Sequence, residues 1–183
     1  VKDSVMDGTR VKNYFKGFKW NVAFPEGLVS TSNPDEMIVP DNWLKFDHNN
    51  RVFNRLASDY PAQLAQRNGN PMMKWEDVRT TLKDIHTDKL HWVKVPLNHI
   101  VIDFDLKDED GNKNLELNVE AASKFPPTYA EVSKSGQGIH LHYIYDGNVN
   151  ELNNLVDKHI EIKVYKGNAS LRPVSYTHLR AHE

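Results

Sequence analysis

Three short segments in the second half of the chain combine the alternation of a β-strand with acidic or histidine side chains. They cover residues 99–105, 139–145 and 160–165, and their polar side chains include Asp103, Asp105, His140, His142 and Glu161. Acidic residues are uncommon in strands, and an ionised side chain is costly to bury without a partner. The pattern therefore predicts that three strands converge on one site, and these residue types favour a metal site.

The signals in this half of the chain predict the order β-α-β-β-α-β. Strands are expected at 99–106, 129–133, 139–145 and 160–165. A helix is expected at 115–125, which Pro126 and Pro127 end, and a second helix is expected after a cap at Asn148 or Asn150. The stripe of that second helix would be Leu152, Leu155, Val156 and His159. This order is that of the split βαβ, or ferredoxin-like, unit.

In the usual sheet order of this unit, the first strand is central and the third and fourth strands flank it. Side chains two residues apart on a strand share a face of the sheet. The face without helices is therefore expected to carry Asp103, Asp105, His140, His142, Glu161 and Lys163. The face under the helices is expected to carry Ile102, Phe104, Leu141, Tyr143, Ile160 and Ile162.

The first half of the chain carries weaker signals. One helical stripe consists of Trp75, Val78, Leu82 and Ile85. A further helix is expected between Trp43 and Leu56. Basic and aromatic side chains interleave between Arg10 and Trp20, which fits a nucleic-acid surface or an amphipathic edge element. The fold class expected from the whole pattern is α+β, with a split βαβ core at 97–166 and an N-terminal α/β extension.

We divide the chain into an N-terminal part at 1–94, a core domain at 95–172 and a tail at 173–183. The tail fits no periodic pattern and resembles the translation of a sequencing adapter. We therefore expect native sequence to stop near Arg172, and the natural protein to continue differently beyond it.

Composition narrows the class of protein. Contents of 39% hydrophobic and 26% charged residues are typical of a soluble globular chain. The absence of cysteine excludes disulfides and thiolate zinc sites. No apolar run is long enough to cross a membrane, and no signal-peptide pattern opens the chain. The net charge of −2 does not by itself favour nucleic acid as a partner, although local basic patches are compatible with it.

Carboxylates two residues apart on a strand can share divalent cations, and Mg²⁺ and Mn²⁺ prefer such oxygen ligands. The alternative for the paired aspartates is a strand end with solvated acids. The turn Ser133–Gly138 offers hydroxyls, backbone N–H groups and an ammonium to a phosphate, or it is a plain hairpin turn. His140 would bind phosphate or transfer a proton, unless it is structural. Lys163 would contact phosphate or template, or pair with Glu161 at the surface.

These residues resemble the archaeo-eukaryotic primase superfamily, in particular phage and plasmid primase-polymerases. That family has an Asp-x-Asp/Glu strand, a glycine-rich turn that runs into a histidine strand, and a third acid in an apolar strand. The corresponding residues here are Asp103 and Asp105, Ser133 through His140, and Glu161. The resemblance covers residues 95–172 and is weak before them. It departs at Gly138-Ile139-His140, where many relatives have Ser-x-His, so the serine role falls to Ser135 or Ser133.

The resemblance implies template-directed nucleotidyl transfer in phage, prophage or plasmid DNA replication, in the cytoplasm of a bacterial host. It implies that Mg²⁺ or Mn²⁺ is bound by Asp103, Asp105 and Glu161, which with His140 would be catalytic. The nucleotide-binding residues would be Ser133, Lys134, Ser135, Gly136, Gly138, His140 and Lys163. The partners would be single-stranded DNA, nucleoside triphosphates and a helicase domain or subunit, with no membrane.

Two other interpretations stay open. His140-Leu141-His142 matches the His-hydrophobe-His pair of replication-initiator nucleases, which hold one metal while a tyrosine attacks DNA. The available tyrosines, Tyr143, Tyr145 and Tyr165, all lie on expected strands. A non-catalytic RNA-recognition module has the same topology, but it binds RNA through strand aromatics, whereas the open face here carries acids. We rank the primase-polymerase first because it also explains the paired aspartates and the glycine-rich turn.

Overall fold

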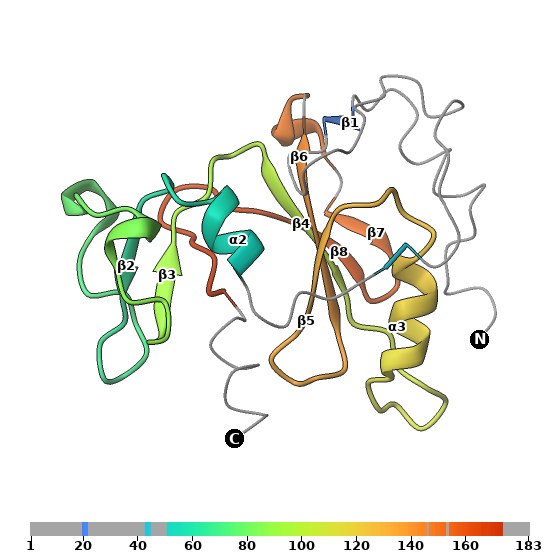
Figure 1. Cartoon of the computed structure of the whole chain (residues 1–183). Helices are drawn as coiled ribbons and strands as arrows, with labels where there is room; N and C mark the ends of the chain where they lie inside the picture. Colours follow the sequence, from blue (N-terminus) through green and yellow to red (C-terminus); the bar gives the residue numbers. More distant parts are fainter. Residues whose placement is uncertain (1–19, 22–42, 45–50, 146, 153, 174–183) are drawn as a thin grey trace. The chain divides into compact units, whose positions relative to one another are not determined.

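The computed structural model describes residues 20–21, 43–44, 51–145, 147–152 and 154–173, and Figure 1 traces them in sequence colours. They form an α+β structure with two antiparallel sheets and few helices. The chain divides into two compact units. The first comprises Val1–Phe46 with Asn98–Val164, and the second comprises Asp47–Leu97 with Tyr165–Glu183. Each unit is described by itself, and the sequence-based division at residues 94/95 and 172/173 stays a prediction.

The first unit is built on a six-stranded antiparallel sheet with β4 at its centre. Its strands are β1 (Trp20–Asn21), β4 (His99–Phe104), β5 (Tyr129–Val132), β6 (Ile139–Tyr145), β7 (Leu155–Asp157) and β8 (Ile160–Val164). β6 pairs with one edge of β4 and β8 with the other. Both β5 and β1 pair with the outer edge of β6, and β7 pairs with β8. The predicted central position of the first core strand is therefore confirmed.

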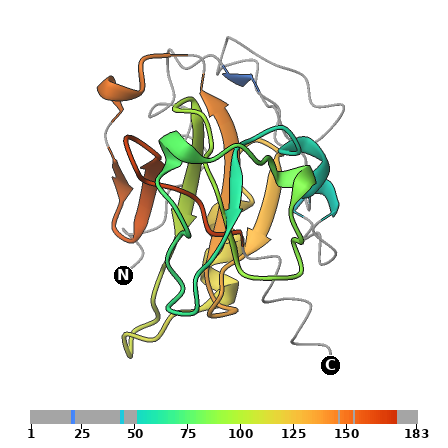
Figure 2. The ribbon, with the colours of Figure 1, turned by 90° about the vertical axis from the view of Figure 1, so that its left-hand side faces the viewer.

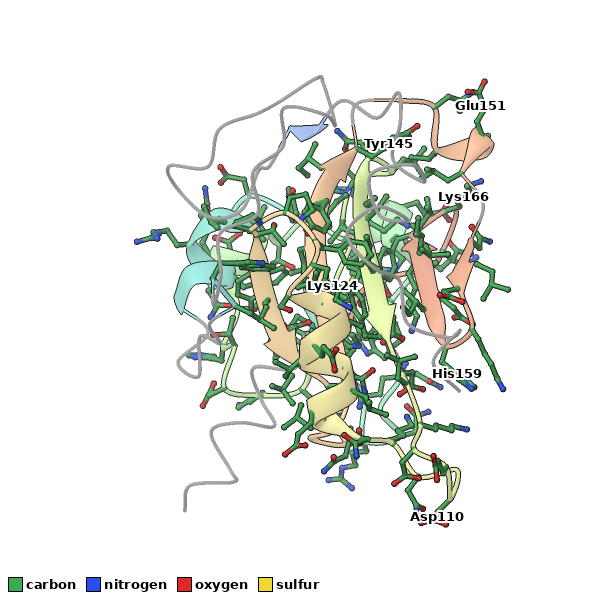
Figure 3. The ribbon with its side chains drawn as sticks, turned by 90° about the vertical axis from the view of Figure 1, so that its right-hand side faces the viewer. Asp110, Lys124, Tyr145, Glu151, His159 and Lys166 are labelled. Carbon is green, nitrogen blue, oxygen red and sulfur yellow. The ribbon has the colours of Figure 1, made fainter. Side chains whose placement is uncertain are left out.

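Helix α3 (Leu115–Ala122) covers the apolar face of this sheet, as Figure 3 shows from the helix side. Asn114 caps the helix, because its side-chain oxygen accepts a hydrogen bond from the Leu117 N–H at 3.1 Å. The helix packs on a core in which the six predicted apolar side chains are all buried: Ile102, Phe104, Leu141, Tyr143, Ile160 and Ile162. Period-two alternation thus predicted this face correctly.

The second predicted helix of the core is wrong. Its place is taken by the 3₁₀ turn η5 (Val149–Glu151) and the edge strand β7. Asparagine is a poor helix former and favours local turns. Here the Asn148 side chain accepts from the Asn150 N–H at 3.0 Å, and the β7–β8 turn holds His159 at φ +63°. Leu155, expected on the buried stripe, is 55% exposed.

In the second unit, strands β2 (Ala62–Leu64) and β3 (His91–Val93) form a two-stranded antiparallel sheet. The rest comprises α2 (Arg51–Leu56) and two 3₁₀ turns, η3 (Trp75–Asp77) and η4 (Leu82–Asp84). Its buried apolar side chains are Phe53, Ala57, Ala62, Val78, Leu82, Val93, Val95 and Leu171. Figure 1 labels both strands of this sheet, and Figure 2 shows the same ribbon from another side.

The helix predicted from the stripe at 75–85 is also wrong. The Thr80 hydroxyl donates to the Ala62 carbonyl at 2.7 Å, and the Asp84 carboxylate accepts from the Thr81 N–H at 2.9 Å. These contacts hold Thr80 and Thr81 extended between two short turns. Of the helix expected between Trp43 and Leu56, α2 is the described helical part, and 45–50 lie outside the described residues.

Two other predicted features fall outside the described part of the chain. The basic and aromatic stretch is described only at Trp20, in β1, and the tail only at Pro173, which is buried. None of the helices in the described ranges combines the length and the apolar character that crossing a membrane requires.

Candidate active site

One register row crosses four strands of the main sheet and carries the polar residues of the candidate site. In β4, Asp103 lies opposite His140 of β6 and, on the other edge, opposite Glu161 of β8. His140 in turn lies opposite Glu131 of β5. Directly paired residues of an antiparallel sheet project from the same face. The row therefore brings three predicted site residues, and the unpredicted Glu131, onto the face opposite α3.

Asp103 and His140 form the centre of this row. The Asp103 Oδ1 atom lies 3.2 Å from His140 Nε2, and Oδ2 lies 2.9 Å from Lys163 Nζ. Burial alone would raise the pKa of Asp103, but the hydrogen bonds and charges of His140 and Lys163 outweigh burial and lower the pKa to about 2. Burial alone would lower the pKa of His140, but Asp103 and Glu131 raise it to about 9. At neutral pH the pair is therefore a carboxylate and an imidazolium.

Asp105 follows directly after the last residue of β4. Its backbone N–H donates to the His159 carbonyl at 2.8 Å, which fixes the strand end beside the β7–β8 turn. Its carboxylate Oδ1 lies 2.9 Å from Lys113 Nζ, and the Asp105 and Lys113 side chains are 39% and 42% exposed. An exposed ion pair of this kind adds little to stability and can exchange partners.

The predicted glycine-rich turn is the hairpin between β5 and β6, drawn as the orange loop below these strands in Figure 1. The Ser133 N–H donates to the Gly138 carbonyl at 2.8 Å, and Gly136 adopts φ +77°, which favours glycine. Ser133 Oγ lies 3.0 Å from Ser135 Oγ and accepts from the Gly138 N–H at 2.9 Å. Lys134 is exposed at the tip.

Gly138 is needed because other groups approach it closely. A Cβ atom at this position would lie 2.8 Å from Ser133 Oγ and 3.1 Å from the Phe104 carbonyl oxygen. The next residue back is tied to the helix, since Asn118 Nδ2 donates to the Gln137 carbonyl at 2.8 Å. Asn118 Oδ1 also accepts from the Leu106 N–H at 2.8 Å. One buried asparagine therefore fixes the hairpin relative to the end of β4.

These elements enclose a surface pocket of about 480 Å³. It is lined by Asp103, Asp105, Lys113, Ser133, Lys134, Ser135 and His140. Six of these seven residues were predicted from the sequence as site residues, and Lys113 was not. We call this part of the polar face the pocket end. Glu161 is exposed and lies beside the pocket end in the register, but it does not line the pocket.

The same face has a second part, which we call the buried end and define by His99, Val101 and His142. All three are at most 1% exposed. His142 Nε2 lies 3.1 Å from Glu131 Oε1, and His142 Nδ1 lies 2.9 Å from His99 Nε2. Burial first, and then the neighbouring His142, hold the pKa of His99 well below its ordinary value. His142 thus belongs to a buried polar chain and does not line the pocket.

Two of the three tyrosines available for a nuclease reaction do not share the face of the sheet from which His140 projects. The Tyr143 side chain lies on the α3 face, fully buried, and its hydroxyl donates to the Pro126 carbonyl at 2.5 Å. Tyr145 shares that strand parity and packs against the same core. Tyr165 belongs to the second unit. Of the three, Tyr143 and Tyr145 therefore project from the face opposite His140.

Two residues of the site were missed by sequence reasoning. Glu131 could have been found, because a hairpin closed by Ser133 and Gly138 places residue 131 opposite His140. It was overlooked because Tyr129-Ala130-Glu131-Val132 reads as a short apolar strand with one acid. Lys113 could not be identified from the sequence, because it follows an acidic turn and belongs to no expected strand or helix. Only the fold brings its side chain to Asp105.

The donor set of the pocket end suits Mg²⁺ or Mn²⁺, because carboxylate oxygens are the ligands these cations prefer. Each aspartate already pairs with a lysine ammonium at 2.9 Å, so each carboxylate faces a position that a cation can take. Lys113 and Lys163 are 42% and 47% exposed, so they can move aside. Within the described ranges, no three His, Asp or Glu side chains converge closely enough to form a ready metal site.

Comparison with known proteins found no similarity: no family model, no curated protein and no solved structure matches the chain.

Proposed function

We propose that this chain catalyses metal-dependent nucleotidyl transfer, as a DNA primase or DNA polymerase of the primase-polymerase type. A primer 3′-hydroxyl, or the hydroxyl of an initiating nucleotide, would attack the α-phosphate of a nucleoside triphosphate and release pyrophosphate. The observation that carries the proposal is the pocket end. There, two aspartates, an imidazolium and a hydroxyl-bearing hairpin surround one open pocket of about 480 Å³.

The residues divide into two groups by chemistry. Asp103, Asp105 and Glu161 would hold Mg²⁺ or Mn²⁺, which when bound would stabilise the charge developing on the phosphate oxygens. The cationic and hydroxyl donors would bind the triphosphate: His140, Lys134, Ser133, Ser135 and, more weakly, Lys163. Lys113 lines the same pocket, where its ammonium pairs with Asp105 in the absence of a metal. The glycines Gly136 and Gly138 would let the hairpin backbone approach the phosphates.

The His140 imidazolium suits this role for a physical reason. A cationic donor makes a stronger hydrogen bond to a phosphate oxygen than a neutral one does. The pKa of about 9 keeps His140 protonated at neutral pH without any ligand. Its Nε2 atom already contacts an anionic oxygen, that of Asp103, at 3.2 Å. A triphosphate in the pocket would present oxygens of the same kind.

The alternatives receive less support. A His-hydrophobe-His nuclease needs His140 and His142 on one accessible metal, whereas His142 is fully buried between His99 and Glu131. An RNA-recognition module would offer aromatic side chains on its open face, whereas the pocket end offers carboxylates and lysines. Single-stranded DNA is the template we propose, and a helicase is a further partner proposed from the resemblance alone.

Primer synthesis on single-stranded DNA tests the proposal. The assay uses labelled ribo- or deoxynucleotides with Mg²⁺ or Mn²⁺ and compares the wild type with Asp103→Ala. Loss of a ligand worth several kcal/mol should reduce product by roughly 10²–10³-fold. Glu109→Gln is the matched control, because it removes an exposed carboxylate of the 107–113 turn outside the pocket and should leave synthesis unchanged.

Equal product from wild type and Asp103→Ala would refute metal-dependent transfer at this site. Absence of synthesis by the wild type, together with a covalent protein–DNA adduct after incubation with single-stranded DNA, would favour the nuclease instead. Binding of RNA unaffected by Asp103→Ala, without synthesis, would favour the recognition module.

A further inference from the structure

Glu131 is a buried acid that the proposed transfer does not itself use. It lies on β5, where all four residues are buried, and it is 5% exposed. An ionised carboxylate in such a place is costly unless several donors surround it. The structure supplies those donors, and they lower the pKa of Glu131 against the opposing effect of burial.

Three donors hold the two carboxylate oxygens. Glu131 Oε1 lies 3.3 Å from His140 Nδ1 and 3.1 Å from His142 Nε2. Glu131 Oε2 accepts from the Tyr129 hydroxyl at 3.3 Å. Because an ionised carboxylate can only accept, both of these imidazole nitrogens must carry hydrogen. Glu131 therefore binds the Nδ1–H of the His140 imidazolium and the Nε2–H of His142.

The consequence for His140 is directional. With Nδ1 held by Glu131, the ring is fixed so that Nε2 faces the pocket end, where it contacts Asp103 Oδ1 at 3.2 Å. A carboxylate bound to one histidine nitrogen commonly orients the other nitrogen for ligand or substrate in this way. Without Glu131, the His140 ring would keep its contact to Asp103 and lose the one that fixes its Nδ1 side.

The buried end makes this support rigid. His142 Nε2 donates to the same Oε1 atom, and its Nδ1 is hydrogen-bonded to His99 Nε2 at 2.9 Å. Both histidines are fully buried. Glu131 thus cannot swing toward the pocket without breaking the contact to His142. The two histidines brace the carboxylate, which explains polar residues at the buried end of the face.

We propose that Glu131 is the positioning residue of His140: it holds the ring so that the Nε2–H, which contacts Asp103 Oδ1 in the free protein, turns to an anionic phosphate oxygen when nucleotide enters the pocket. The class of anion rests on the proposed function, and the role of Glu131 toward His140 does not. Glu131 touches no substrate in this arrangement and acts through the imidazole.

A double-mutant cycle tests the proposal on the full chain. Binding of dATP and of ATP, each with Mg²⁺, is measured by calorimetry for wild type, Glu131→Gln, His140→Ala and the double variant. Glu131→Gln should weaken nucleotide binding about tenfold, as expected for an orienting partner. In the His140→Ala background the same change should have no effect beyond twofold, because it acts through His140. An equal loss in both backgrounds would indicate a merely structural role and overturn the proposal.

Tyr129→Phe is the matched control. It removes the hydroxyl at 3.3 Å from Oε2 and leaves both imidazole contacts to Oε1, so nucleotide binding should stay within twofold of wild type. A tenfold loss in Tyr129→Phe would show that any disturbance of the carboxylate weakens binding. The inference would then fail.

A second readout needs neither nucleotide nor activity. In the nucleotide-free wild type, the Nδ1 hydrogen of His140 should give a protected proton signal in nuclear magnetic resonance, because it is bonded to a buried carboxylate. The signal should persist in Tyr129→Phe and disappear in Glu131→Gln. Its absence from the wild type overturns the inference even if Glu131→Gln does not fold. Its presence in a protein that binds neither dATP nor ATP would sustain the positioning role and refute the proposed function.

Discussion

Two histidines on one strand show how differently the two ends of the polar face behave. His140 and His142 lie two residues apart on β6 and project from the same face, yet their side chains are 18% and 0% exposed. His140 faces Asp103 and an open pocket and is held as a cation. His142 lies between Glu131 and the neutral His99 in the interior. Residue type and strand parity are the same, so burial and the identity of the partners decide the chemistry.

The largest effect that separates the two ends should be on stability. His142→Ala removes a fully buried side chain and leaves His99 and Glu131 each without one partner. The cavity and the two buried polar groups left without this partner should together lower the free energy of unfolding by about 3–5 kcal/mol. Lys163→Ala, at the pocket end, removes a 47% exposed ammonium and should cost less than about 1 kcal/mol.

Urea denaturation followed by circular dichroism gives both values. A similar loss of stability in the two variants would contradict the division of the face into a buried end and a pocket end. A larger cost for Lys163→Ala would reverse that division.

The pocket end was more predictable than the rest of the fold for a physical reason. In β4, β6 and β8, strict alternation and β-branched residues specify which side chains share a face, and a one-residue slip would bury Glu161 under α3. The second helix was predicted from an asparagine cap and a hydrophobic stripe, and the 75–85 helix from a stripe alone. In both places hydrogen bonds of Asn148, Thr80 and Asp84 favour turns instead. Those contacts are not visible in hydrophobic spacing.

The partners within the site were less predictable than its face. Parity places His140 and His142 together, but it does not reveal that one is open and the other is buried. Nor does it reveal that Lys113 reaches Asp105 from outside any regular element. Such contacts depend on how loops and strands cross, which a single sequence specifies only through the completed fold.

The next effect in size is a pH dependence of opposite sign at the two ends, measured with a chelator present. The pKa of His140 is raised from 6.5 to about 9, so the folded state binds more protons than the unfolded chain between these values. Its contribution is fully present below pH 6.5 and is lost as pH rises through 9, by up to about 3 kcal/mol. The pKa of His99 is lowered instead, so its contribution is present above pH 6.5 and is lost as pH falls below that value.

Urea denaturation from pH 5 to pH 10 measures how the free energy of unfolding changes with pH on the acid and the alkaline side. His140→Asn should flatten the alkaline slope and leave the slope between pH 5 and 6.5 in place. His99→Asn should do the reverse, whatever its effect on absolute stability. If both variants flatten the same limb, the two ends do not titrate independently and the comparison fails.

The smallest effect concerns the lysines that pair with the aspartates. If Lys113 occupies a cation position on Asp105, Lys113→Gln should leave stability within about 0.5 kcal/mol of wild type. It should also lower the Mn²⁺ concentration for half-maximal primer synthesis, by roughly two- to tenfold, because an ammonium 2.9 Å from the carboxylate no longer competes. Lys124→Gln is the control, since Lys124 lies beyond α3, 4.0 Å from Glu120 and outside the pocket, and it should change neither quantity.

A higher Mn²⁺ requirement in Lys113→Gln would mean that Lys113 helps to hold the triphosphate with its metal. The pocket end would then be a phosphate site whose cations are supplied mainly by the protein.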